Sequence, residues 1–233
     1  PHLGRGVEDP LGFYRETCPK EAWVPYGDTM SLDEVEAVVL KDLPFFEESD
    51  GGVTLSGGEV LLQSEFAKSL LQRLKASGVH TAVETTGYAT KAAVDAVATH
   101  CDLWLFDLKH HDNDRHRKFT GQDMGQILEN LAYIWDRCVP LELRIPVIPG
   151  VNNTPEDAER FVALIQNTLT PRPDEESGQQ WPPITLLPFH QFGQKKYDLL
   201  GKEYTFSDVA ALQPEDLDTY ASILRTHSFA VTV

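Results

Sequence analysis

The sequence predicts a single α/β domain built on a parallel β-sheet. Apolar strand-like runs alternate with amphipathic helix patterns from residue 31 to the C-terminus, and the strand runs are apolar at nearly every position. Strands of this kind belong to parallel sheets that are covered on both faces. Such a sheet is either a closed barrel or an open doubly wound sheet, and the pattern alone leaves both possible. At 233 residues the chain is long enough for one large domain of this class.

The first predicted helix begins at Ser31, because Ser31 and Glu34 have the spacing of a capping box ahead of an apolar stripe. A strand at 53–55 follows. A helix with apolar residues at helical spacing over 66–74 comes next and ends at Gly78. These segments make up the first strand and helix unit.

The same unit repeats toward the C-terminus. Strands are expected at 79–84, 102–108, 141–148, 184–189 and 229–233, and helices at about 90–100, 124–137, 154–165 and 214–226. Residues 171–183 are rich in Pro, Gly and charge and are expected to form a surface loop. Residues 1–30 lack periodicity and are interpreted as the remnant of an N-terminal element, so the barrel domain should span 31–233.

Composition excludes several classes of function. The 36 acidic against 20 basic residues give a formal charge of −16, which disfavours a nucleic acid partner or an anionic membrane surface. No apolar run is long enough to span a bilayer. Three widely spaced cysteines fit a reducing cytoplasm better than a disulfide scaffold. We therefore expect a cytoplasmic protein that binds neither nucleic acid nor membrane.

Polar side chains recur at the carboxyl ends of the predicted strands, where α/β proteins bind ligands. They are Glu59, Glu84, Thr85, Asp107, Lys109, Arg144 and His190. Each alone could be an ordinary ion pair or a satisfied histidine, but five strand ends that agree favour a binding site. The carboxylates suit an ammonium or sulfonium group, and the bases, with backbone amides near Gly57 and Gly58, suit a carboxylate or ribose oxygens. An amino-acid-like zwitterion satisfies both sets, whereas no phosphate-binding motif is present.

Five motifs in a fixed order carry a resemblance to a known family. They are SGGE at 56–59, ETTG at 84–87, DLK at 107–109, RIPVIPG at 144–150 and LLPFHQFG at 186–193. Together they resemble the radical S-adenosylmethionine activases of glycyl radical enzymes, the family of pyruvate formate-lyase activating enzyme, over residues 17–233. The resemblance implies a partial β/α barrel of about six units, TIM-like and of the radical SAM type, with the cofactor across its open mouth.

The resemblance also implies an activity and its partners. Such an activase reductively cleaves S-adenosylmethionine and generates a glycyl radical on a partner glycyl radical enzyme by hydrogen abstraction. Its electron donor would be a flavodoxin or a ferredoxin, and its metabolic setting is anaerobic.

Specific residues acquire expected roles from the same resemblance. Gly57, Gly58 and Glu59 would hold the methionyl amino group. The rest of S-adenosylmethionine would be contacted by Thr85, Asp107, Lys109, Arg144 and His190. A monovalent cation near the methionyl carboxylate would be held by Glu84, Thr85 and Asp107, with Glu84 standing where the family commonly has Asp.

The family's cluster motif is absent from this sequence. Members carry CxxxCxxC after their first strand, where three thiolates hold a 4Fe-4S cluster, and Cys18, Cys101 and Cys138 do not have that spacing. We expect the first strand and its cluster loop to be missing from the sequence shown, so that this chain alone is inactive. CPKEA at 18–22 resembles the end of a ferredoxin-like insertion, in which Cys18 would have served an auxiliary cluster. No catalytic residue is identified in the chain itself.

Three alternatives remain open. The protein could be a descendant that has lost the cluster and the radical chemistry. It could be a Schiff-base aldolase on a β/α barrel that uses Lys109 as its nucleophile. It could also be a non-catalytic barrel subunit that binds a partner through its mouth, in which case it would bind no cofactor.

Overall fold

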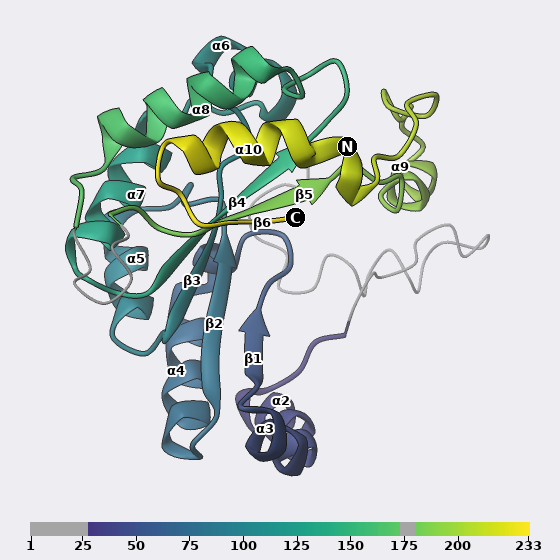
Figure 1. The fold of residues 1–233 in the computed structure, drawn as a ribbon. Helices are drawn as coiled ribbons and strands as arrows, with labels where there is room; N and C mark the ends of the chain where they lie inside the picture. The colour runs from purple at the N-terminus through teal and green to yellow at the C-terminus, as the bar shows by residue number, and fades with distance from the viewer. Residues whose placement is uncertain (1–27, 173–179) are drawn as a thin grey trace.

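The computed structural model describes residues 28–172 and 180–233 of the chain (Figure 1). The predicted N-terminal remnant up to residue 27, which includes Cys18, lies outside the described residues. So does 173–179, the middle of the predicted surface loop.

A six-stranded parallel sheet forms the centre of the fold. Its strands are β1 (Gly52–Leu55), β2 (His80–Thr85), β3 (Leu103–Asp107), β4 (Leu141–Val147), β5 (Ile184–Pro188) and β6 (Val231–Thr232). Every neighbouring pair is parallel, and the spatial order is the sequence order from β1 to β6. A doubly wound sheet reverses its order at a switch point, whereas barrel strands follow one another. The order therefore selects the barrel, and the predicted partial barrel is confirmed.

The main helices form one outer layer on this sheet, as Figure 1 shows. They are α4 (Ser64–Ala76), α5 (Lys91–Ala98), α7 (Gly125–Asp136), α8 (Pro155–Thr168) and α10 (Asp218–Thr226). Two shorter helices, α2 (Leu32–Val39) and α3 (Leu43–Ser49), lie near the start of β1. Among the described residues no helix has both the length and the apolar character needed to cross a membrane.

Side chains on the helix-covered face of the sheet make the core. On β3, Trp104 and Phe106 are fully buried with the helix residues, whereas Leu105 and Asp107 on the other face are only half-buried. β4 shows the same alternation. The expectation that the strands are covered on both faces is therefore wrong for the described residues. Helices cover the outer face of the curved sheet, and its inner face lines the barrel interior.

The two helices whose N-terminal capping residues were predicted from the sequence begin where those residues stand. Ser31 forms its capping box with Glu34 and starts α2. Thr154 caps α8. The predicted helix over 214–226 is divided into a 3₁₀ turn, η3 (Pro214–Leu217), and α10.

Several short elements were not predicted from the sequence. These are α3, α6 (Asn113–Thr120), α9 (Gln194–Leu199) and the 3₁₀ turns η1 (Leu40–Asp42) and η2 (Val60–Gln63). The helix α6 matters most for function because it lies beside the strand ends that carry the predicted site.

Candidate cofactor-binding site

The loop after β1 leaves its main chain accessible. Gly57 has φ of +134°, which L side chains rarely adopt. A Cβ atom built on Gly57 or Gly58 would meet nothing within 4 Å, so open space surrounds both residues. Glycine is therefore required at 57 for conformation, and together the two residues leave room for a ligand to approach the backbone.

The carboxylate of Glu59 ties this loop to the end of β2. Its Oε1 accepts hydrogen bonds from the Thr85 hydroxyl at 2.6 Å and from the Leu61 amide at 3.2 Å. Its Oε2 accepts from the Thr86 hydroxyl at 2.7 Å and from the Thr86 amide at 3.0 Å. Four donors hold the carboxylate in one orientation at the mouth, where its negative charge attracts a cation.

Two ion pairs lie on the inner face of the sheet. Arg144 pairs with Glu84 at 3.0 Å, and Lys109 pairs with Asp107 at 3.0 Å. Asp107 and Lys109 share one face, as predicted from their separation of two, while Leu108 between them is buried under the helices. The Oδ1 atom of Asp107 is buried and accepts no hydrogen bond from the described residues. This free acceptor and the remaining ammonium protons of Lys109 are available to a polar ligand.

His190 belongs to the mouth but stands apart from the other polar residues. It is exposed just after β5, its Nδ1 accepts a hydrogen bond from the Phe192 amide at 3.3 Å, and its ring lies 4.2 Å from the Phe192 ring. No contact between His190 and Glu59 or Lys109 is present among the described residues.

The three residues expected around a monovalent cation have different partners in this structure. Glu84 is held by Arg144, Thr85 by Glu59 and Asp107 by Lys109. Within 28–172 and 180–233 there is no group of three or more His, Cys, Asp or Glu side chains arranged for a metal ion. The cation site stays a prediction.

A cleft runs from the Glu59 loop along α6. Its first part, of about 330 Å³, lies between Glu59 and Lys109 and the α6 residues His116 and Thr120. Beyond Lys109 the cleft continues into a second, mainly apolar cavity of about 250 Å³ that reaches Phe206. Sequence reasoning missed His116 because it lies on an unpredicted helix. It also passed over Thr86, whose place in the ETTG motif was the available signal.

The two described cysteines are at the opposite end of the barrel. Cys101 and Cys138 precede β3 and β4, whereas the polar residues lie within or just beyond the carboxyl-terminal halves of the strands. Burial raises the pKa of the Cys101 thiol to about 12, so it stays protonated and is a poor metal ligand. The described residues therefore do not fit an iron–sulfur cluster, although they do fit an amino-acid-like ligand at the mouth.

Comparison with known proteins places this chain in a family. The sequence profile of the Radical SAM superfamily matches residues 14–165. The chain belongs to this superfamily.

Within it, the radical SAM chain is 37% identical over 215 residues to the choline trimethylamine-lyase activating enzyme of Oleidesulfovibrio alaskensis, covering 92% of this chain and 67% of that protein. It is 38% identical over 218 residues to the pyruvate formate-lyase 2-activating enzyme of Escherichia coli, covering 94% and 71%. Its family is therefore that of the glycyl-radical-enzyme activases.

A solved structure agrees with this placement. The radical SAM chain superposes on a domain of a pyruvate-formate lyase-activating enzyme from Bacteroides vulgatus with a TM-score of 0.60 and 30% identity, covering 78% of this chain and 98% of that one. The chain spans only about 60% of a further relative, the isethionate sulfite-lyase activating enzyme of Oleidesulfovibrio alaskensis, to which it is 37% identical. The cofactors of the family are S-adenosylmethionine and a 4Fe-4S cluster.

Proposed function

We propose that this protein is an activase that cleaves S-adenosylmethionine reductively and removes a hydrogen atom from a backbone glycine of a partner glycyl radical enzyme. The chemistry that S-adenosylmethionine would supply when bound is one-electron cleavage of its sulfur–C5′ bond, which would release methionine and leave the 5′-deoxyadenosyl group to take this hydrogen. The observation that carries the proposal is the combination of an open Gly57-Gly58 main chain with fixed charges of both signs at the strand ends.

The residues of the chain bind and orient the cofactor in this proposal. Glu59 and the glycine loop attract the methionyl amino group. Lys109 and Arg144 lie on the inner face to meet the carboxylate and the ribose, and the free Oδ1 of Asp107 accepts a further hydrogen bond. Thr85 acts through Glu59, and His190 would close over the ligand from the far side of the mouth. Fixed orientation of the sulfonium is the protein's contribution to rate.

The cluster and the protein partners complete the proposal. The 4Fe-4S cluster would be held by thiolates outside the described residues, because Cys101 and Cys138 are at the wrong end of the barrel. The electron would come from a flavodoxin or ferredoxin in the cytoplasm. A monovalent cation bound by Glu84, Thr85 and Asp107 would require these side chains to exchange their present partners for the ion.

The Schiff-base aldolase is the weaker alternative. A lysine nucleophile has to lose its charge, and Lys109 is instead paired with Asp107 at 3.0 Å. Borohydride in the presence of a carbonyl substrate should leave Lys109 unmodified. A non-catalytic subunit would fail to bind S-adenosylmethionine at all.

The test uses a natural-length protein with its cluster reconstituted under anaerobic conditions. Addition of reductant and S-adenosylmethionine should yield 5′-deoxyadenosine by chromatography. Addition of a glycyl radical enzyme should give the EPR signal of a glycyl radical. A fully loaded protein that produces no 5′-deoxyadenosine would overturn the proposal.

A further inference from the structure

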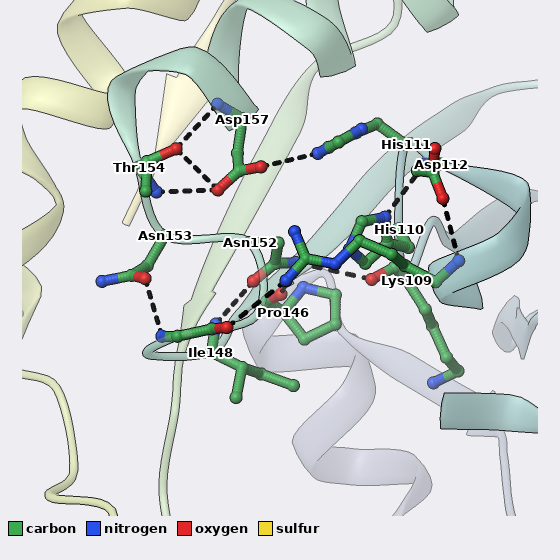
Figure 2. Close-up of polar contacts among 12 residues, drawn as sticks. Lys109, His110, His111, Asp112, Pro146, Ile148, Asn152, Asn153, Thr154 and Asp157 are labelled. Atoms are coloured by element: carbon green, nitrogen blue, oxygen red, sulfur yellow. Dashed lines mark hydrogen bonds and ion pairs between the residues drawn. The ribbon is translucent and has the colours of Figure 1, made fainter. Parts of the chain in front are cut away.

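The loop between β4 and α8 is hydrogen-bonded to the chain segment just beyond β3, as Figure 2 shows. Its central residue is Asn152, which is completely buried. The side-chain oxygen of Asn152 accepts from the Ile148 amide at 2.7 Å. Its amide nitrogen donates to the Pro146 carbonyl at 2.8 Å and to the Lys109 carbonyl at 3.4 Å. One side chain thus joins the end of β4 and the start of its own loop to Lys109, two residues beyond β3.

Asparagine suits this position because the site presents one donor and two acceptors. Aspartate would face two carbonyl oxygens with an acceptor, and an apolar residue would leave all three backbone groups unpaired. The contact comes where the regular ladder stops, since the Leu108 amide donates to the Arg144 carbonyl at 2.9 Å and no later ladder bond follows. Asn152 therefore extends the restraint on β3 by one residue, to Lys109.

A second contact holds the same segment two residues later. The side chains of His111 and Asp157 are both buried and lie 2.7 Å apart. Asp157 also completes the capping box at Thr154 that starts α8. The main chain of Lys109 is thus fixed on both sides, while its ammonium group stays partly exposed and reaches Asp107.

We propose that Asn152 is a positioning residue that acts through Lys109. The hydrogen bond from Asn152 to the Lys109 carbonyl fixes the position of the Lys109 main chain. That position determines the direction in which the lysine side chain extends into the mouth and meets the methionyl group. This inference rests on the proposed binding of S-adenosylmethionine by Lys109.

The test is a double-mutant cycle on binding, with the natural-length, cluster-loaded protein and calorimetry of S-adenosylmethionine. Asn152→Ala and Lys109→Met should each weaken affinity, by roughly tenfold for Asn152→Ala. In the Lys109→Met background, Asn152→Ala should cause no further loss. Asn153→Ala is the matched control. It removes the neighbouring bond from the Gly150 amide to Asn153, at 2.9 Å, without touching Lys109, and should leave affinity unchanged.

The outcomes separate the two proposals. If Lys109→Met leaves affinity unchanged, the proposed cofactor site is wrong. If Lys109→Met weakens binding but the Asn152 effect is absent or simply additive, the positioning role is overturned and the site survives. Thermal unfolding is measured in parallel. If Asn152→Ala does not fold, Asn152→Ser replaces it, because its shorter hydroxyl side chain brings no charge into this buried position. Failure of both variants to fold would make Asn152 a purely structural residue and would also overturn the proposal.

Discussion

Gly87 in the ETTG motif is confined by its φ of +74° and by a neighbouring ring. A Cβ atom at Gly87 would lie 2.2 Å from Cζ of Phe106, which is fully buried, so the ring could move only by displacing its neighbours. We expect Gly87→Ala to lower the free energy of unfolding by about 3 kcal/mol, from positive φ and overpacking together. Gly78 also has positive φ, +78°, but open surroundings, so Gly78→Ala should cost only about 1 kcal/mol. If Gly87→Ala and Gly78→Ala lowered the free energy of unfolding equally, as measured by chemical denaturation, the packing argument would be contradicted.

Glu59 is the residue whose charge we expect to matter most for the cofactor. Glu59→Gln keeps the shape but removes the negative charge and turns one acceptor into a donor facing Leu61 or Thr86. We expect weaker S-adenosylmethionine binding in the natural-length protein, by about 1.5–3 kcal/mol, measured by calorimetry. Glu65→Gln, on the exposed side of α4, is the control and should bind normally. An unchanged affinity for Glu59→Gln would remove Glu59 from the site.

At the residue scale, the positions of the site residues could be predicted from the sequence better than their ion-pair partners. Arg144 could have balanced Glu142, which is two residues away on the same strand face. It pairs instead with Glu84, 60 positions earlier, because the register places β2, β3 and β4 side by side with Arg144 next to Asp107. Strand pairing over such a separation leaves no local signal in one sequence.

At the scale of elements, His110 in the segment after β3 makes stability depend on pH. Burial and the neighbouring His111 lower its pKa to about 4, as does Arg115, while Asp112 and the Val151 carbonyl oppose the shift. The pKa of an unfolded histidine is about 6.5, so between these values the unfolded state binds more protons. Stability from His110 is therefore complete above about pH 6.5 and is lost as the pH falls toward 4.

The expected size of this effect is at most about 3 kcal/mol between pH 7 and pH 4. Urea unfolding at a series of pH values checks it. His110→Gln should be less stable at pH 7 but should lose most of the slope between pH 6.5 and 4. His227→Gln removes a half-exposed histidine at the end of α10 and should keep the slope. A slope that persists in His110→Gln would assign it to other groups.

Helix prediction succeeded where an apolar stripe was present, as in α4 and α7, which have no side-chain N-cap, and it missed α6, which has caps but no stripe. The helix α6 has the sequence NDRHRKFT, in which only His116 is buried, so it shows no apolar stripe. It is defined by Asp112, which caps its start, and by Gly121 with φ of +79° at its end. Such a helix depends on its place beside Lys109 and the β4 loop, and one sequence does not reveal that environment.

At the scale of the whole molecule, local pattern could not choose between a barrel and a doubly wound sheet. Both alternate strands with helices, and only the order of strands in space separates them. The ordered motifs resolved this ambiguity through family resemblance, and the consecutive order from β1 to β6 confirms the outcome. The same strand order brings the carboxyl ends of the strands together, so the fold determines where the site lies. The ion pairs within the site could not be predicted from the sequence.

The last prediction concerns the cluster. The 233-residue chain, incubated anaerobically with iron and sulfide, should stay colourless and give no EPR signal after reduction. Cys101 and Cys138 lie just before neighbouring strands, at the end away from Glu59 and Lys109. Burial raises the pKa of the Cys101 thiol to about 12, so it stays protonated at neutral pH. Cys18 has no second cysteine at cluster spacing.

A longer form that carries the family's CxxxCxxC motif should turn brown, bind four irons and cleave S-adenosylmethionine when reduced. Replacing the cysteines of that motif by alanine should abolish the colour, whereas Cys101→Ala and Cys138→Ala should not. If the 233-residue chain itself bound four irons, Cys18 would have to be a cluster ligand together with a second thiolate source. That result would contradict the expectation that the cluster thiolates lie outside this sequence.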